Sequence, residues 1–218
     1  NDESGNDNNG TVSGATLATD RNGTAGRAYI FDGVDDKITV NFANAPQGNS
    51  ARTLSLWVKA SDLVTANKHA INWGTMVNGQ AYGLIKGYYN SEHEWITYAH
   101  GVATHDQNTT VLVDNLWHQV TITYDSTRVR TYIDGALRHT GTVALNTTGN
   151  NMLIGAALDN SGFWQGKMDD IRIYDRTLGS AEVTQLYGLQ KPIFYNGLVA
   201  YYPFNGNAND ESVNDNNG

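Results

Sequence analysis

Short runs of alternating hydrophobic and polar residues follow one another along most of the chain, separated by Gly, Asn and Asp. In Lys37-Ile-Thr-Val-Asn-Phe42 the apolar side chains occupy every second position, which is the pattern of a strand with one buried face. Asp134-Gly135 lies between two such runs, and this dipeptide is a strong hairpin signal there. We expect strands at residues 28–31, 37–42, 53–59, 70–73, 81–85, 95–99, 117–124, 129–133, 137–140, 152–155, 170–174 and 197–204.

One segment has helical periodicity instead. Ser180 is a suitable N-cap, Glu182 follows in the first turn, and Val183, Leu186 and Tyr187 recur at i, i+3 and i+4. The pattern predicts a helix of about two turns over residues 180–187, which connects strands rather than forming a layer.

The two ends of the chain repeat each other. Asn1-Asp-Glu-Ser-Gly-Asn-Asp-Asn-Asn-Gly10 returns as Asn209-Asp-Glu-Ser-Val-Asn-Asp-Asn-Asn-Gly218, with nine of ten residues identical at an offset of 208 positions. Because solenoid repeats are only about 20–50 residues long, this period indicates a tandem array of whole domains. We expect one domain over 1–218 in permuted order, with a main body at 1–196. Residues 197–218 are then the first strand and the Asn-rich loop of the next repeat.

That arrangement leaves the body without its own first strand. Because an unpaired strand edge is costly, we expect residues 198–204 to fold back and complete the body. The alternative is that two chains exchange this strand and form a domain-swapped dimer.

Composition narrows the class of protein. The 218 residues suit one all-β domain, and a net charge of −8 argues against nucleic acid, whose binding needs clustered Lys and Arg. The chain has no cysteine for a disulfide framework and no apolar run long enough for membrane insertion.

A set of motifs along the chain carries a family resemblance. They are Phe31-Asp-Gly-Val-Asp-Asp36, Leu54-Ser-Leu-Trp-Val58, Leu116-Trp-His-Gln-Val120, Tyr132-Ile-Asp-Gly135, Gly166-Lys-Met-Asp-Asp-Ile-Arg-Ile-Tyr174 and Gly197-Leu-Val-Ala-Tyr-Tyr-Pro-Phe204. In this order they resemble the bacterial branch of the laminin G-like family of concanavalin A-like jelly rolls. The resemblance implies an all-β, two-sheet antiparallel sandwich that binds glycans or proteins in secreted and cell-surface proteins. It also implies a structural calcium ion in many members, and no reaction.

The Asn-rich segment offers oxygen atoms at alternate positions, and calcium takes about six to eight oxygen ligands. We hypothesise a calcium site that joins one copy of this segment to the acidic pair before the strand at 170–174. The candidate ligands are Asp2, Asn6, Asp169, Asp170, Asp210 and Asn214. Two alternatives stay open: that Asp35 and Asp36 bind the ion, or that Asn, Asp and Gly only form turns.

Sugar binding needs aromatic surfaces beside hydrogen-bonding groups, and residues 87–95 hold the densest such cluster. The candidate ligand-binding residues are Tyr88, Tyr89, Asn90, His93 and Trp95. The alternative is that Trp95 packs between the sheets together with Trp73, and we expect Trp57 and Trp117 in the core.

Catalysis has little support in the sequence. Glu92 and Glu94 are the one acidic pair with a spacing that suits glycoside hydrolysis, but they flank His93 in an expected loop. No nucleophile elbow or phosphate-binding loop is present. We therefore expect a non-catalytic carbohydrate-binding or adhesion module of an extracellular or bacterial cell-surface repeat protein, with a glycan or a cell-surface or matrix protein as partner. The alternative is a structural spacer or protein-binding domain of an adhesin stalk.

Overall fold

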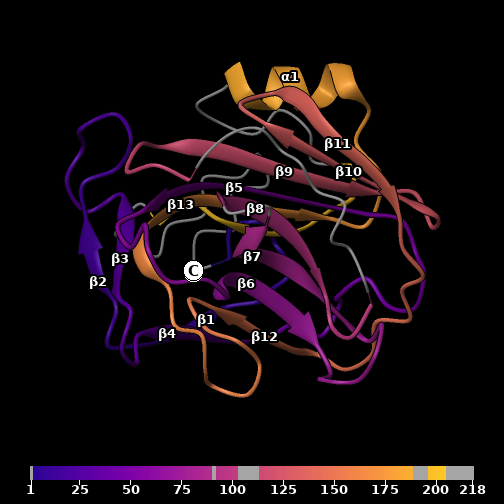
Figure 1. The fold of residues 1–218 in the computed structure, drawn as a ribbon, viewed down its shortest axis with the longest axis horizontal. Helices are drawn as coiled ribbons and strands as arrows, with labels where there is room; N and C mark the ends of the chain where they lie inside the picture. The colour runs from indigo at the N-terminus through magenta and orange to yellow at the C-terminus, as the bar shows by residue number, and fades with distance from the viewer. Residues whose placement is uncertain (1, 90–91, 103–112, 189–195, 205–218) are drawn as a thin grey trace.

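The computed structural model describes residues 2–89, 92–102, 113–188 and 196–204 of the chain (Figure 1). They form two antiparallel β-sheets that pack face to face, and α1 (Ser180–Gly188) lies against the outer side of the larger sheet (Figure 1). This confirms the predicted two-sheet sandwich with one helix among the described residues.

The smaller sheet has six strands in the order β1-β4-β12-β6-β7-β8. Its strands are β1 (Gly10–Ser13), β4 (Lys37–Asn41), β6 (Lys68–Gly74), β7 (Ala81–Tyr89), β8 (Glu92–Ala99) and β12 (Asn151–Ile154). The sequence pattern did not predict β1, because its residues are largely exposed and show no apolar alternation.

The larger sheet has eight strands, seven of them in the order β11-β10-β9-β5-β13-β3-β2. Its strands are β2 (Thr16–Ala18), β3 (Ala28–Asp32), β5 (Arg52–Ala60), β9 (His118–Tyr124), β10 (Arg128–Ile133), β11 (Ala136–Thr142), β13 (Gln165–Tyr174) and β14 (Leu198–Tyr202). Asp134-Gly135 forms the turn between β10 and β11, as predicted.

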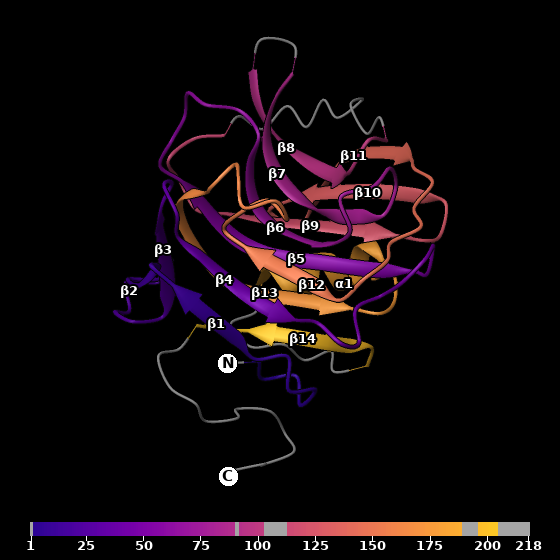
Figure 2. The same ribbon diagram turned by 90° about the horizontal axis from the view of Figure 1, so that it is seen from below.

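The eighth strand, β14, pairs with β13 in the same chain. The first half of β13 pairs with β3, from Gln165 to Met168, and the second half pairs with β14, from Ile171 to Tyr174. β14 therefore continues the line of β3 along one side of β13, and Figure 2 shows it beside β13. All five of its side chains are buried. Exchange of this strand between two chains stays a prediction.

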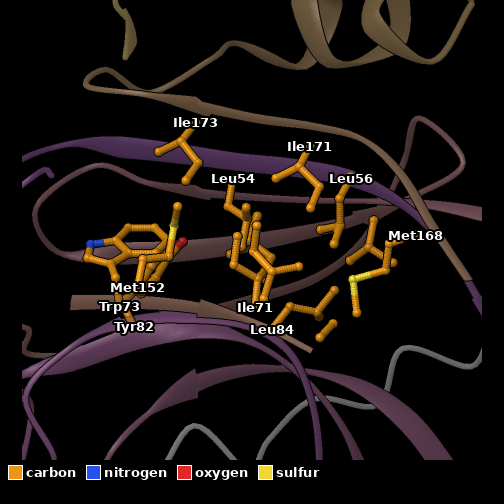
Figure 3. Close-up of a cluster of buried hydrophobic side chains, with 14 of the residues drawn as sticks. Leu54, Leu56, Ile71, Trp73, Tyr82, Leu84, Met152, Met168, Ile171 and Ile173 are labelled. Atoms are coloured by element: carbon orange, nitrogen blue, oxygen red, sulfur yellow. The ribbon is translucent and has the colours of Figure 1, made fainter. Parts of the chain in front are cut away.

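The core lies between the two sheets. Leu54 and Leu56 of β5 face Ile71 and Trp73 of β6 (Figure 3). Val58 of β5 belongs to the same cluster, and all five side chains are fully buried. Burial of each such side chain contributes roughly 1.5–3 kcal/mol relative to its exposure to water. The period-two pattern of β5 in the sequence therefore reports the face that holds the sandwich together.

A second, smaller cluster lies under the helix, where Val183 and Leu186 pack on Tyr174 and Tyr201. The first helical hydrogen bond runs from the Val183 amide to the Gly179 carbonyl, so the N-cap is Gly179, one residue before the predicted Ser180.

Two tryptophans correct the predicted core. Trp57 is half-buried on the outer side of the sheet, where its ring stacks on Tyr187 of α1 at 5.6 Å between centroids. Trp117 is also half-buried. Trp57 occupies the polar face of an alternating strand, so the alternation itself placed it outside the sandwich.

Candidate functional site

A pocket of ≈ 530 Å³ opens where the ends of β3 and β5 and the start of β13 meet the turn between β1 and β2. We call it the rim pocket. It is lined by Gly14, Thr16, Ile30, Phe31, Asp32, Asp36, Ser61 and Gln165.

The rim pocket presents polar side chains to solvent. Thr16, Asp32, Ser61 and Gln165 are all exposed, and they supply two hydroxyl groups, a carboxylate and an amide. Ile30 is 37% exposed and adds an apolar surface beside them. A concave site with an apolar patch and a few convergent hydrogen-bonding groups is the usual form of a small-molecule site.

The wall that carries Asp32 is held by its own hydrogen bonds. The Asp32 carboxylate accepts from the Val34 amide at 2.8 Å, and the Asp36 carboxylate accepts from the Asp32 amide at 2.9 Å. Gly33 has φ +84°, and a Cβ there would lie 2.8 Å from Cβ of Gln165. The turn therefore needs glycine both for its backbone and for its contact with β13.

The two pocket carboxylates differ in their electrostatics. Burial raises the pKa of Asp36, and the charges of Asp32 and Asp35 raise it further. The pKa of Asp32 is lowered, chiefly by the hydrogen bond from the Val34 amide. The possible ligand atoms of Asp32, Asp35 and Asp36 lie within 4.8 Å of one another, so this wall is rich in acceptors and negatively charged.

The predicted aromatic cluster is divided by the structure. Tyr88 is 56% exposed near the end of β7, and its ring lies 4.9 Å from that of His93. Trp95 is fully buried against Trp164 at 5.9 Å, so a ligand does not reach it, and Trp73 is buried as well. Tyr89 ends β7, and Asn90 lies outside the described residues.

The acidic pair that was considered for catalysis lies in a strand. Glu92 and Glu94 both belong to β8, which corrects their predicted place in a loop. Glu94 is 5% exposed. The strand extends to the tip of the β7–β8 hairpin because the cross-strand register continues to Tyr89 and Glu92.

Asp169 and Asp170, the second half of the hypothetical calcium site, both bind Arg21. The guanidinium lies 2.5 Å from the Asp169 carboxylate and 2.6 Å from that of Asp170. Consecutive strand residues normally face opposite sides, but β13 has a register shift here and Asp170 has φ 51°. This irregularity explains how one arginine contacts two adjacent aspartates.

The surroundings of this pair are tightly packed. Arg21 stacks over Trp57 at 4.8 Å, and the Asp170 carboxylate also accepts from the Tyr201 hydroxyl at 3.1 Å. Burial raises the pKa of Asp169 to about 8, and the charge of Asp170 acts in the same direction. Nothing in the sequence pattern pointed to Arg21, which lies in a turn-rich segment without periodicity.

The first half of the hypothetical calcium site lies along β14. The Asp2 carboxylate accepts from the backbone amides of Ser4, Asn8 and Tyr201, and the Asn6 side chain donates to the Leu198 carbonyl. The matching residues Asp210 and Asn214 lie outside the described residues.

These donor sets differ in how well they fit calcium. Arg21 contacts both Asp169 and Asp170, and Arg172 lies 3.4 Å from the Asp170 carboxylate, so two cations already balance this pair. The Asp2 carboxylate accepts from three backbone amides. Within the part of the chain that the structure describes, no Lys or Arg forms an ion pair with Asp32, Asp35 or Asp36, and their carboxylate oxygens are closely spaced. Charge balance therefore favours this acidic wall, which includes the alternative ligands Asp35 and Asp36, over Asp169 and Asp170.

Comparison with known proteins places this fold in a family. A family model described as the concanavalin A-like lectin/glucanases superfamily, Laminin_G_3, matches residues 32–184, more than half of the chain. The chain belongs to this superfamily. The predicted resemblance is thereby confirmed, and no curated protein sequence matches the chain.

Solved structures share the lectin/glucanase fold at low sequence identity. Domain 4 of AbnA, a GH43 extracellular arabinanase from Geobacillus stearothermophilus solved in complex with arabinotriose, has a TM-score of 0.62 and 20% identity, over 82% of this chain and 87% of that one. The binding domain of Paraclostridial Mosquitocidal Protein 1 has a TM-score of 0.59 and 16% identity, over 84% and 48%. The botulinum neurotoxin serotype D binding domain has a TM-score of 0.56 and 19% identity, over 84% and 48%.

This superfamily member therefore spans about half of the two toxin binding domains and most of the arabinanase domain. Within its described residues there is no helix with the length and apolar character that a membrane crossing requires.

Proposed function

We propose that this chain is a non-catalytic carbohydrate-binding module and that the rim pocket holds the sugar. The observation that carries the proposal is the pocket itself, which combines exposed hydroxyl, amide and carboxylate groups with the apolar surface of Ile30. Sugar hydroxyl groups both donate and accept hydrogen bonds, so Asp32 accepts from them while Gln165 does both.

The volume of the rim pocket and the family of the fold are both consistent with binding the end of an oligosaccharide. A volume of ≈ 530 Å³ lies within the usual range of ligand sites, roughly 300–1,000 Å³. The fold supports the same class, since the chain belongs to a lectin/glucanase superfamily and one structural neighbour is a domain in complex with arabinotriose.

A binding titration tests the proposal. A glycan array that includes arabino-oligosaccharides identifies a ligand, and isothermal titration then compares the wild-type chain with Asp32→Asn and Gln165→Ala. Asn keeps the oxygen that accepts from the Val34 amide but loses the charge, so the turn stays folded while the pocket changes. We expect each change to weaken binding by about tenfold, the loss of one hydrogen bond that involves a ligand.

Asp175→Asn is a matched control, since Asp175 is exposed at the end of β13, away from the pocket lining. Unchanged affinity in both pocket variants contradicts the proposed site. The surface of Tyr88 and His93 is the second candidate, and in that case Tyr88→Ala abolishes binding instead.

Several narrower expectations belong to this proposal. We place the module in an extracellular or cell-surface protein, where weak sugar binding gains strength through repeated domains. Calcium bound at Asp32, Asp35 and Asp36 predicts glycan binding that is lost in EDTA and returns with added calcium. If no glycan binds the folded chain in either buffer, the spacer or protein-binding alternative holds.

A further inference from the structure

The N-terminal Asn-rich segment, residues 2–8, forms hydrogen bonds along one edge of β14. Its contacts fall on the backbone of Leu198, Val199 and Tyr201 and on the hydroxyl of Tyr202, a set that we call the β14 edge. The Glu3 amide donates to the Tyr201 carbonyl at 2.7 Å, and the Tyr202 hydroxyl donates to the Asn8 carbonyl at 2.5 Å.

Side chains of the segment supply the remaining bonds. Asp2 accepts from the Tyr201 amide at 2.8 Å, and Ser4 and Asn8 donate to the Val199 carbonyl at 3.1 and 2.8 Å. Asp2 also accepts from the amides of Ser4 and Asn8, so it holds the segment in the shape that fits the strand. The segment is therefore a folded ligand of the β14 edge.

Every side chain that makes these contacts is repeated at the other end of the chain. Asp2, Ser4, Asn6 and Asn8 correspond to Asp210, Ser212, Asn214 and Asn216. Residues 1–10 and 209–218 thus carry the same recognition groups, although the chain has one β14 edge to offer them.

The connection from β14 to the second copy has a suitable length. The N-terminal segment runs antiparallel to β14, since residues 2 and 3 contact Tyr201 while residue 6 contacts Leu198. A copy that followed β14 would return along its edge as in a hairpin. Residues 205–208 span up to roughly 14 Å when extended, which exceeds the roughly 10 Å that residues 202–204 span beyond Tyr201.

One position separates the two copies. Gly5 has φ +82°, and no heavy atom lies within 4 Å of a Cβ built there, so a larger side chain has space but a strained backbone. The second copy has Val213 at this position, and a β-branched residue rarely adopts positive φ. The strain makes residues 209–218 the weaker occupant by roughly tenfold or more.

We propose that the β14 edge is a binding site for the Asn-rich decapeptide and that residues 209–218 occupy it whenever residues 1–10 are displaced. The occupant is the copy in the same chain, because the connection through residues 205–208 is long enough for it to return along β14. This proposal is independent of sugar binding, because the rim pocket contains none of these residues.

Point variants in the full chain test it. Asp210→Ala alone leaves the melting temperature unchanged, because the N-terminal copy is the stronger occupant. Asp2→Ala alone lowers it by less than about 4 °C, since the second copy takes over, and the double variant lowers it by more than the sum of the two. Val213→Gly in the Asp2→Ala background restores the melting temperature. The control is Asp215→Asn in the same background, which leaves the melting temperature of Asp2→Ala as it is, because the matching residue Asp7 is exposed.

Additive effects in the double variant, or no rescue by Val213→Gly, overturn the proposal. Light scattering of the Asp2→Ala variant is expected to show a monomer, in which the chain supplies its own copy. A dimer would mean that a second chain supplies the copy, and it would overturn the proposal. A synthetic peptide with the sequence of residues 1–10, added to the double variant, is expected to bind about tenfold more tightly than one with the sequence of residues 209–218. If the double variant does not fold while both single variants do, the two copies substitute for each other as proposed.

Discussion

The change of Arg21 to alanine is a direct test of how the outer side of the larger sheet is stabilised. Arg21 contacts Asp169 and Asp170 at 2.5 and 2.6 Å, and the three side chains are 11%, 3% and 6% exposed. Removal of one partner from a buried ion pair costs about 3–5 kcal/mol, because a charge is left buried and uncompensated. Arg21 retains some exposure, and Arg172 remains 3.4 Å from the Asp170 carboxylate, so we expect the lower end, about 3 kcal/mol at neutral pH.

The cost should depend on pH. The pKa of Asp169 is raised to about 8 in the folded chain, so the folded state binds a proton that the unfolded state releases near its ordinary value of 3.8. The stabilisation of the folded state by proton binding at Asp169 is therefore fully present below about pH 4 and is lost as the pH rises through about 8. Above this pH Asp169 carries a negative charge beside Asp170, and Arg21 offsets the repulsion between the two carboxylates. Arg21→Ala should therefore lower the unfolding free energy least at pH 5 and most at pH 9.

Urea unfolding of the wild-type and variant chains at pH 5, 7 and 9 measures this difference in unfolding free energy. Arg130→Ala is the matched control, because Arg130 pairs with Asp125 at 2.9 Å with exposures of 26% and 32%, and exposed pairs contribute only about 0.2–1 kcal/mol. A cost for Arg21→Ala that is below about 1 kcal/mol at pH 9, or that is the same at all three pH values, refutes the reasoning.

Three further predictions concern single side chains. Burial lowers the pKa of His69 to about 4, so stability should fall by about 3 kcal/mol as pH drops from about 6.5 to 4, and His69→Gln should remove this dependence in acid titration. The pKa of His118 is raised, chiefly by its hydrogen bond to Asp134, so its contribution is complete at acid pH and is lost as pH rises above its ordinary value of 6.5; urea unfolding of His118→Asn against the wild type should show this. Tyr202→Phe leaves the Asn8 carbonyl without its donor and should cost about 1–3 kcal/mol in thermal unfolding, while a loss below about 0.5 kcal/mol would show that the bond is unimportant.

Most strands of the sandwich could be predicted from the sequence, because a strand with one buried face has apolar residues at every second position. Thr53 to Lys59 and Lys37 to Phe42 gave the strand positions and their buried faces, and the Asp134-Gly135 turn gave a neighbour relationship. β1 and β2 were not predicted, because neither strand buries a face and neither shows alternation of apolar and polar residues.

The sites were harder to read, because they depend on contacts between distant segments. Arg21 meets Asp169 across 148 positions, and the rim pocket gathers Thr16, Ser61 and Gln165 from three separate strand ends. None of these residues belongs to a motif by itself. Aromatic composition pointed to residues 87–95, but composition does not distinguish the exposed Tyr88 from the buried Trp95.

The most direct test of the central claim is isothermal titration of the full chain with the best ligand from a glycan array, repeated for Asp32→Asn and for Tyr88→Ala. The account predicts that the wild type binds, that Asp32→Asn binds about tenfold more weakly, and that Tyr88→Ala binds as the wild type does. Binding that survives Asp32→Asn and disappears in Tyr88→Ala would place the sugar on the β7–β8 hairpin and contradict the account.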